Sequence, residues 1–508
     1  MPRRWKVLAT VAMVSCFISG WFLQRQLTAG GDVYQQARLF ENVLAHVREY
    51  YVDSIAEPEL YHKATEGMLT RLRDPYAALL AGKELERHVE RTTGDYAGIG
   101  LLVDARNGWV TVVTPMQDSP AERAGVRTGD QLFEVGGLSA ADWTLDRAVQ
   151  AMRGKLGTPI DIAIRREGAA EPLRFRLVRE RIHQRAVPPG ILLPDGVGYL
   201  NMTMVRENAA EELAREVATL VEQGMRVLLL DLRSNPGGLR DEAVAVSDLF
   251  LDPRQDILVS RGRAPGDNHR WSDFRPQRWP DLPVVVLVSG GTASAAEIIA
   301  GALQDHDRAL IVGDTTYGKG IVQTVFTLSH DLALRMTTAR WYTPSGRSIQ
   351  GTALDSAMGA QPTGGGLIPD VVLGRDTLTT SESTFAQSLG GQITVFRDVL
   401  TAFALELRKG RTVGSEQFQV TAAMRAEVQR RLRDRGVAMA DSVFGGAARI
   451  VDEQLGYEIA RYTFGQAAER RRRAAGDPQI QRAIELVRGT TSRQALLGLA
   501  DQAPPQAH

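Results

Sequence analysis

The chain has 508 residues, of which 44% are hydrophobic and 24% charged, values that fit several globular domains and exclude a disordered or collagen-like chain. Its 60 Lys and Arg residues balance its 60 Asp and Glu residues, so it lacks the basic excess with which proteins neutralise nucleic-acid phosphates, and we expect no nucleic-acid partner. Cys16 is the only cysteine, which excludes an intramolecular disulfide framework and a cysteine-based zinc site.

The amino terminus carries an export signal, because a basic flank precedes an uncharged apolar run over residues 7–23. This run is at the short end of a membrane-spanning helix. Trp21 and Phe22 lie where a cleavage site would need small residues, so we favour an uncleaved membrane anchor within residues 1–30 over a cleaved signal peptide or a buried core helix. The basic flank stays in the cytoplasm, which places the remaining chain in the periplasm or on another extracytoplasmic face, anchored to the inner membrane.

Residues 33–93 are predicted to be a helical region. Leu39, Val43 and Val47 repeat every four residues, and so do Leu60, Ala64 and Met68, which gives each helix an apolar stripe for a helical collar or a dimer contact. The Asp74-Pro75 pair ends the second helix, because the residue before proline avoids helical angles. Residues 76–80 are predicted to be a connecting segment.

Residues 94–182 change to short strands separated by glycines. The segment Gly98-Ile99-Gly100-Leu101 leads into a strand, and residues 110–113 form a second one. A short helix near residues 119–125, a helix over 144–152 and a strand over 160–165 follow. This order resembles a PDZ domain, which binds free carboxyl termini by adding the peptide as a strand. The resemblance implies that the backbone of Gly98, Ile99, Gly100 and Leu101 binds the terminal carboxylate, whereas a glycine-rich hairpin without a ligand is the alternative.

After residue 186 the pattern predicts a layered α/β domain. Four apolar runs, residues 197–202, 227–232, 284–288 and 310–312, are typical of buried strands. Helices are expected over residues 209–223 and 295–303, and the polar stretch 261–280 is expected to be an exposed loop.

Ser294 lies where the strand 284–288 turns into a helix, a position at which helix N–H groups and the helix dipole favour negative charge. An ordinary serine N-cap is the alternative. Downstream, Lys319 lies between two glycines, and Gln323 follows four residues later, on the same side of a strand. Burial lowers the pKa of a lysine toward that of a general base, whereas a surface lysine is the alternative.

Three motifs in this domain resemble the carboxyl-terminal processing (tail-specific) proteases. They are Asp231–Gly238 with the sequence DLRSNPGG, Gly291–Glu297 with GTASAAE, and Tyr317–Gln323 with YGKGIVQ. The resemblance spans about residues 35–375 and implies an α/β fold: a layered α/β (ClpP/crotonase-like) serine protease core with a helical lead-in over 186–375, and an inserted PDZ domain over 94–182.

The resemblance also implies the roles of the site residues. Ser294 would be the nucleophile, Lys319 the general base and later acid, and Gln323 the residue that orients the lysine. The backbone N–H groups of Gly237, Gly238 and Ala295 would form the oxyanion hole, with no metal and no cofactor. Glu297 and Asp305 match acidic positions of some relatives, for which a helix-dipole role and an exposed carboxylate are the alternatives. His306 and His330 lie in no motif of a Ser–His–Asp triad.

Residues 376–508 are predicted to be a helical C-terminal extension, with helices over 396–407, 422–433 and 447–464. It could serve as a dimerisation element, a lid or an adaptor contact. For the whole chain we expect a serine endopeptidase that acts on extracytoplasmic proteins with free carboxyl termini, alone, as a homodimer or with an adaptor. A non-catalytic scaffold would have no need of Lys319 at this spacing from Ser294.

Overall fold

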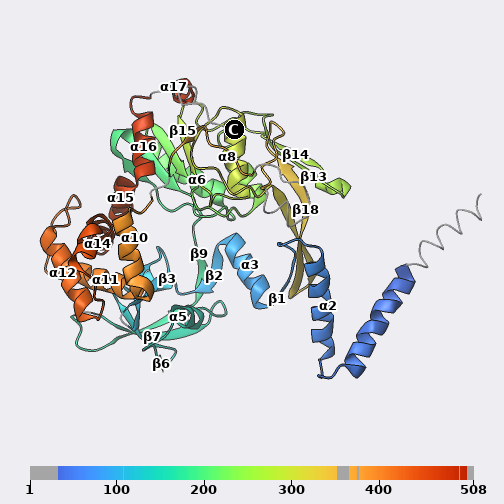
Figure 1. Ribbon diagram of the computed structural model, residues 1–508, viewed down its shortest axis with the longest axis horizontal. Coiled ribbons are helices and arrows are strands. Elements are labelled where there is room, and N and C mark those ends of the chain that lie inside the picture. The colour runs from blue at the N-terminus through green and yellow to red at the C-terminus, as the bar shows by residue number, and fades with distance from the viewer. Residues whose placement is uncertain are drawn as a thin grey trace, which may run out of the picture. The chain divides into compact units, whose positions relative to one another are not determined.

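The computed structural model describes residues 33–499 except 107, 167, 352–364, 375–376 and 491 (Figure 1). It divides into two compact units, one formed by the residues up to Leu80 with Val325–Thr337 and the other by Ala81–Thr324 with the residues from Thr338 onward. The predicted membrane segment, residues 7–23, lies outside the described residues. In the part of the chain that is described, no helix combines the length and apolarity needed to cross a bilayer.

The first unit starts with a helix over residues 33–50 and continues with α2 (Glu57–Arg71). Leu39 and Val43 of the predicted stripe remain exposed. The expected connection over residues 76–80 is partly wrong, because Ala78–Ala81 form strand β1, which pairs with β18 (Leu332–Tyr342). The carboxylate of Asp74 accepts the N–H of Thr337 in β18 at 3.0 Å. The Asp-Pro break therefore leads directly into a sheet.

The same sheet continues beyond β18. β18 pairs with β13 (Asp256–Gly262), which in turn forms a hairpin with β14 (His269–Ser272). The prediction of a loop over residues 261–280 was therefore wrong for its first half. The residues of β14 are exposed or half-buried, and a strand without a buried face has no apolar alternation from which it could be recognised.

Residues 94–182, predicted to be a PDZ domain, form a sheet in the order β3-β4-β5-β7-β8, with β6 on β5, around their own apolar core. The helix expected over residues 144–152 and the strand expected over 160–165 are both present. The bounds are β3 (Leu101–Arg106), β4 (Trp109–Pro115), α4 (Pro120–Arg123), β5 (Gln131–Val135), β6 (Leu138–Ser139), α5 (Leu145–Met152), β7 (Pro159–Arg165) and β8 (Leu173–Val178). This domain is joined to the next by an antiparallel pair, β2 (Asp95–Gly98) with β9 (Glu180–His183).

The core domain is built on a six-stranded sheet in the order β10-β11-β12-β15-β16-β19, in which every pair is parallel except β10 with β11. The core domain opens with two strands, and its first α-helix is α6. The helical lead-in is α3 (Lys83–Thr93), which lies before the PDZ segment in the chain. The strands are β10 (Ile191–Leu193), β11 (Val197–Asn201), β12 (Val227–Asp231), β15 (Val284–Val288), β16 (Leu310–Gly313) and β19 (Val371–Val372).

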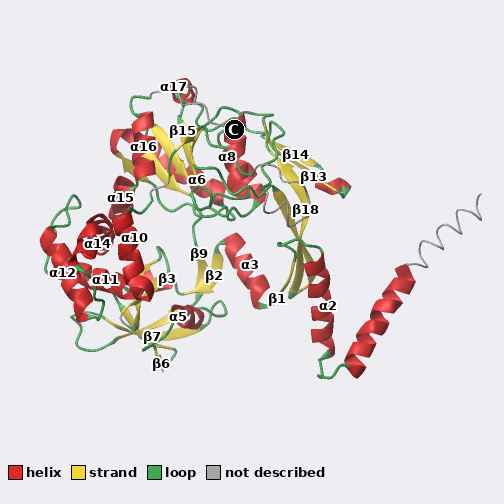
Figure 2. Ribbon diagram, viewed as in Figure 1, coloured by secondary structure: helices red, strands yellow, loops and turns green. Residues whose placement is uncertain are grey.

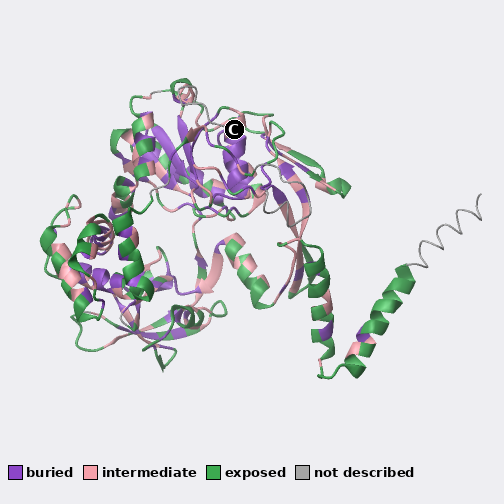
Figure 3. Cartoon of the chain, in the orientation of Figure 1, coloured by how far each residue is buried: buried purple, intermediate pink, exposed green. Residues whose placement is uncertain are grey.

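Helices cover both faces of this sheet, so successive residues of each strand face different cores. Leu228, Leu230 and Val286 belong to the core beneath α6 (Ala209–Glu222), α7 (Arg240–Asp248) and α8 (Ala295–Asp305). Leu229 and Leu287 face the opposite way, against α16 (Pro478–Val487) and α17 (Arg493–Leu497). Figure 2 shows the strands between α16 and α8, and Figure 3 shows that α8 is buried along its length.

The C-terminal extension is helical, as predicted, and has its own apolar core. Its further helices are α10 (Thr380–Leu389), α11 (Ile393–Lys409), α12 (Ala422–Asp434), α13 (Asp441–Gly446), α14 (Ala448–Phe464) and α15 (Gln466–Gly476). It contacts the segment 94–182 through Arg397, which donates to Asp104 at 2.6 Å. Because α16 also covers one face of the core sheet, the extension contacts both neighbouring domains.

Candidate active site

Ser294 lies between the buried strand β15 and helix α8, as the sequence predicts. Its backbone is in an unusual conformation for a residue with a side chain, with φ 54° and ψ −118°, which persists only where the surroundings enforce it. The side chain makes no cap hydrogen bond, and it is the carbonyl of Ser294 that accepts the N–H of Glu297 at 2.8 Å. Ser294 is therefore not an ordinary N-cap, because its hydroxyl does not accept a hydrogen bond from the first turn of α8.

Lys319 lies just before β17 (Ile321–Ser329), and its Nζ donates to Oε1 of Gln323 at 2.9 Å. The expected contact is therefore present, although Lys319 itself precedes the strand on which the prediction placed it. Both side chains are half-buried. The lysine backbone is held as well, because Trp341, itself only 1% exposed, donates from Nε1 to the carbonyl of Lys319 at 3.1 Å.

The flanking glycines allow close packing of the lysine segment. A Cβ on Gly318 would lie 2.7 Å from the backbone nitrogen of Gly366, and one on Gly320 would lie 3.0 Å from that of Gln350. A side chain at Gly318 would require the backbone to shift, and one at Gly320 would require the neighbouring backbone to move by a few tenths of an ångström. The segment around Lys319 is thus fixed by main-chain contacts on both sides.

The carboxylate of Glu297 joins the serine and lysine segments. Oε2 accepts the N–H groups of Ser294 at 2.7 Å and Lys319 at 2.9 Å, while Oε1 accepts the hydroxyl of Thr316 at 2.5 Å and the N–H of Gly318 at 2.7 Å. Glu297 is fully buried. Burial raises the pKa of this carboxyl, and the four hydrogen bonds only partly offset that effect. Glu297 therefore does more than interact with the helix dipole, because its carboxylate holds the Ser294 and Lys319 segments together.

The turn Asn235–Gly238 packs directly against the serine. A Cβ on Gly237, whose φ is +92°, would lie 2.6 Å from the carbonyl oxygen of Ala293 and 2.8 Å from the nitrogen of Ala295. Ala295 is the first residue of α8, so its N–H has no acceptor within the helix. The two segments predicted to supply oxyanion donors are therefore in contact.

The N–H groups of this turn differ in their directions. The N–H of Gly237 donates to the side-chain oxygen of Asn235 at 2.9 Å, so it is already engaged within the turn. The carbonyl of Gly237 accepts from Val205 at 3.0 Å, and in a trans peptide the next N–H, that of Gly238, points the opposite way. Asn235, for which the sequence predicts no role, lies in the motif DLRSNPGG and is fully buried.

Two family patterns match this chain. The sequence pattern of Peptidase family S41 matches residues 196–371, and that of the PDZ domain matches residues 111–166. A carboxy-terminal-processing protease of Bartonella bacilliformis is 36% identical over 374 residues, which are 72% of this chain and 82% of that protein. The chain belongs to the carboxyl-terminal processing proteases of family S41.

Two further relatives extend the comparison. A probable CtpA-like serine protease of Staphylococcus haemolyticus is 32% identical over 323 residues, 64% of each chain. Among solved structures, the photosystem II D1 C-terminal processing protease is 28% identical and covers 66% of this chain and 87% of its own, at a TM-score of 0.38. The S41 and PDZ matches, with the Bartonella relative, make the present chain a serine peptidase of this family with a PDZ domain.

In this protease the predicted carboxylate loop of the PDZ domain turns its carbonyls inward. The carbonyl of Ile99 accepts the N–H of Ala121 at 3.0 Å, and that of Gly100 accepts the N–H of Met116 at 2.8 Å. Because trans peptides place consecutive C=O and N–H groups on opposite sides, the N–H groups of Gly100 and Leu101 point away from these partners. This orientation suits an incoming carboxylate.

Three other candidate residues of the sequence are Asp305, His306 and His330. The alternative of an exposed carboxylate at Asp305 was wrong, because its side chain is only 5% exposed, pairs with Arg347 and accepts the N–H of Ser345 at 2.8 Å. Burial would raise the pKa of Asp305, but hydrogen bonds with Thr343 and Ser345 and the charge of Arg347 outweigh it and lower the pKa. His306 lies at the far end of α8 and binds the carbonyl of Asp256 at 2.7 Å, and His330 is exposed in the turn after β17.

Proposed function

We propose that this peptidase cleaves peptide bonds by a Ser–Lys–Gln mechanism. The observation that carries the proposal is the joint positioning of the two reacting residues, in which the backbones of Ser294 and Lys319 bind one carboxylate oxygen and Lys319 Nζ is held by Gln323. Such fixed geometry supplies a large part of the rate enhancement of enzymes.

In the proposed reaction, Lys319 in its neutral form accepts the proton of the Ser294 hydroxyl as the oxygen attacks the substrate carbonyl. The negative charge that develops on the carbonyl oxygen is met by the N–H groups of Ala295 and Gly238. Protonated Lys319 then returns its proton to the leaving amine, and the peptide bond breaks to give an acyl-enzyme. Water, deprotonated by the same lysine, releases the acyl group and restores Ser294.

The site is tested by Ser294→Ala and Lys319→Ala in the full-length enzyme. Each substitution should reduce peptide cleavage by about 10⁴-fold or more, because nucleophile and base act as a unit. Lys83→Ala, an exposed lysine in α3, is the matched control and should leave the rate unchanged. Substantial cleavage by either purified and folded site variant would contradict the proposal.

We further propose that the PDZ domain selects substrates by their free carboxyl termini through Gly98, Ile99, Gly100 and Leu101. The inward-facing carbonyls of this loop support that role. A substrate with a terminal carboxylate should be cleaved at least about 10-fold faster than its carboxamide, since charged hydrogen bonds to backbone N–H groups are about twice as strong as neutral ones.

Gly100→Ala tests whether this loop is responsible for the preference. Its Cβ would lie 2.2 Å from Cβ of Ser119, whereas Gly137→Ala, also at positive φ in this domain, would meet no atom within 4 Å. Gly100→Ala should therefore abolish the preference for the acid, and Gly137→Ala should keep it. Equal rates on acid and amide in the unmodified enzyme would contradict terminal recognition.

Residues 7–23 are proposed to anchor the enzyme on the extracytoplasmic face of the inner membrane. The apolar run with its basic flank supports this location. Removal of residues 1–30 should move the protein from the membrane fraction to the soluble fraction. An unchanged membrane fraction would argue against the anchor.

A further inference from the structure

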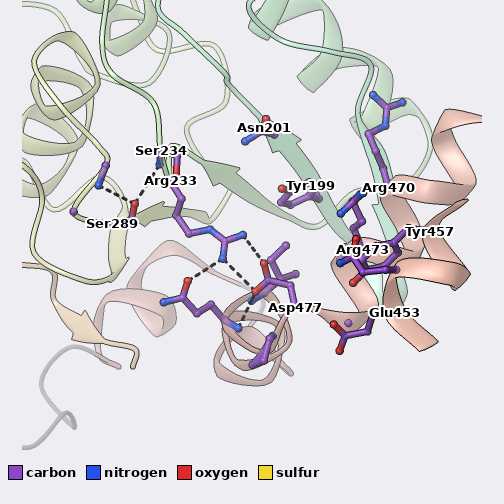
Figure 4. Close-up of a pocket in the computed structure, with 18 residues that line it drawn as sticks. Tyr199, Asn201, Arg233, Ser234, Ser289, Glu453, Tyr457, Arg470, Arg473 and Asp477 are labelled. Carbon is purple, nitrogen blue, oxygen red and sulfur yellow. Dashed lines mark hydrogen bonds and ion pairs between the residues drawn. The ribbon is translucent and has the colours of Figure 1, made fainter. Parts of the chain in front are cut away.

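The C-terminal extension contacts the core domain at Arg233, which lies two residues before the turn Asn235–Gly238. Asp477, between α15 and α16, accepts from Nη1 of Arg233 at 3.1 Å and pairs with Nη2 at 2.9 Å, and Gln479 accepts from Nη1 at 2.9 Å. On its other edge, the guanidinium donates to Asp231 at 3.0 and 2.7 Å. Figure 4 shows Arg233 reaching toward Asp477.

The three charged groups are shielded from water to different degrees. The side chains of Asp231, Arg233 and Asp477 are 3%, 17% and 28% exposed. Burial would lower the pKa of Arg233, but its hydrogen bonds to both carboxylates outweigh that effect and raise it. Removal of one carboxylate would leave the buried charge of Arg233 incompletely paired and would move its guanidinium.

Arg233 is connected by a short, strained stretch of backbone to the residues beside the nucleophile. Ser234 has a φ of 57°, and its N–H donates to the hydroxyl of Ser289 at 3.2 Å. Three residues later, Gly237 lies against Ser294 and Ala295. A shift of the guanidinium would therefore be transmitted to the turn that faces the reacting serine.

A cavity of about 850 Å³ lies along the same boundary. Its core side includes Ser234 and the Ser289–Gly291 loop, and its other side includes Tyr457 and Asp477 of the extension (Figure 4). The extension thus forms a wall beside the active-site loops.

We propose that Asp477, with Gln479, is a positioning residue of the active site that holds Arg233 and, through it, the turn from Ser234 to Gly238. The proposal rests on the proposed Ser–Lys–Gln function and adds to it a part of the chain outside the matched protease region. In this role Asp477 acts through Arg233 and not on the substrate. It keeps the oxyanion donors in place, and a displacement of about 1 Å at such a site can reduce the rate by about 10²-fold.

Asp477 also has a local structural role that must be separated from this one. Its Oδ1 accepts the N–H groups of Gln479 at 2.9 Å and Ile480 at 3.0 Å, so it caps the amino end of α16. Asparagine caps helices as well as aspartate does. Asp477→Asn therefore removes the charge that binds Arg233 and keeps the cap.

The experiment measures kcat, KM and the unfolding midpoint of the full-length enzyme on a peptide with a free carboxyl terminus. The matched control is Asp452→Asn, which neutralises a carboxylate of α14 that pairs with Arg425 within the extension at 2.6 Å. Gln479→Leu removes the other acceptor of Arg233 and serves as a second variant.

Asp477→Asn should lower kcat by about 10-fold or more and change KM by less than about threefold, because oxyanion donors act in the transition state. Gln479→Leu should lower kcat by a smaller factor, and Asp452→Asn should change neither constant. Asp477→Glu, which keeps the charge, should recover part of the kcat.

An unchanged kcat in Asp477→Asn, or an equal loss in Asp452→Asn, would overturn the proposal, as would a loss confined to KM. Ser294→Ala decides the proposed function separately. An active wild type with an inactive Ser294→Ala and an unaffected Asp477→Asn would therefore refute only the positioning role.

Discussion

The backbone N–H groups of Ser294 and Lys319 donate to the same atom, Oε2 of Glu297, at 2.7 and 2.9 Å. The two residues belong to different sequence motifs, and one buried carboxylate fixes their positions relative to each other. The alignment of nucleophile and base thus depends on a side chain that takes no part in the proposed bond-making steps.

Glu297→Gln should lower kcat/KM by at least about 100-fold, because an amide offers one acceptor oxygen and turns its NH₂ group toward groups that are themselves donors. It should also reduce the free energy of unfolding by about 2–4 kcal/mol, since buried donors lose their acceptor. Steady-state kinetics and urea denaturation test both effects. The exposed Glu222→Gln should change stability by less than about 0.5 kcal/mol. Equal behaviour of the two variants would contradict the bridging role.

Gly237→Ala should lower kcat by about 100-fold or more, because its Cβ would force the turn away from Ala293 and Ala295 and so displace the oxyanion donors. Gly224→Ala is a matched control: its φ of +93° is nearly the same as the +92° of Gly237, but its Cβ would meet no atom within 4 Å. Each substitution carries a strain of about 1–2 kcal/mol for positive φ, so thermal unfolding should detect both. Activity should fall only in Gly237→Ala, and a comparable loss in Gly224→Ala would refute the local explanation.

His183 should make the stability of the enzyme depend on pH. Its Nδ1 lies 2.7 Å from a carboxylate oxygen of Asp95 in β2, and its Nε2 lies 2.7 Å from one of Glu212 in α6. The histidine thus joins the β2–β9 pair to α6. Burial would lower the pKa of His183, but the hydrogen bonds and charges of the two carboxylates outweigh it and raise the pKa. The stabilisation is therefore complete below about pH 6.5, the ordinary value for histidine, and is lost as the pH rises through the raised pKa.

Unfolding midpoints between pH 5 and 9 test this prediction. The gain in stability on acidification should be smaller in His183→Gln than in the wild type. His269→Gln, an exposed histidine in β14, should retain the wild-type profile. Parallel profiles for the wild type and His183→Gln would show that the histidine does not act as expected.

Much of the core domain could be predicted from local patterns. The strand Val284–Val288 has the predicted bounds, and α6 and α8 start at the predicted residues 209 and 295, because runs of branched apolar residues and helical periodicity reflect burial directly. The Lys319–Gln323 contact was also expected from the even spacing of the two residues, although only Gln323 lies on the strand and Lys319 precedes it.

The sequence by itself therefore determined the core strands, which depend on short-range periodicity, while the candidate catalytic residues came from the resemblance of three motifs to a protease family. Only the tertiary structure decided that β14 is a strand, that Asp305 is shielded, that the N–H of Gly237 is engaged by Asn235, and that Asp477 binds Arg233, 244 residues away. The physical reason is that a hydrogen bond or an ion pair depends on distance and direction in space, which the packing of α15 and α16 on the core sets and which local sequence does not record.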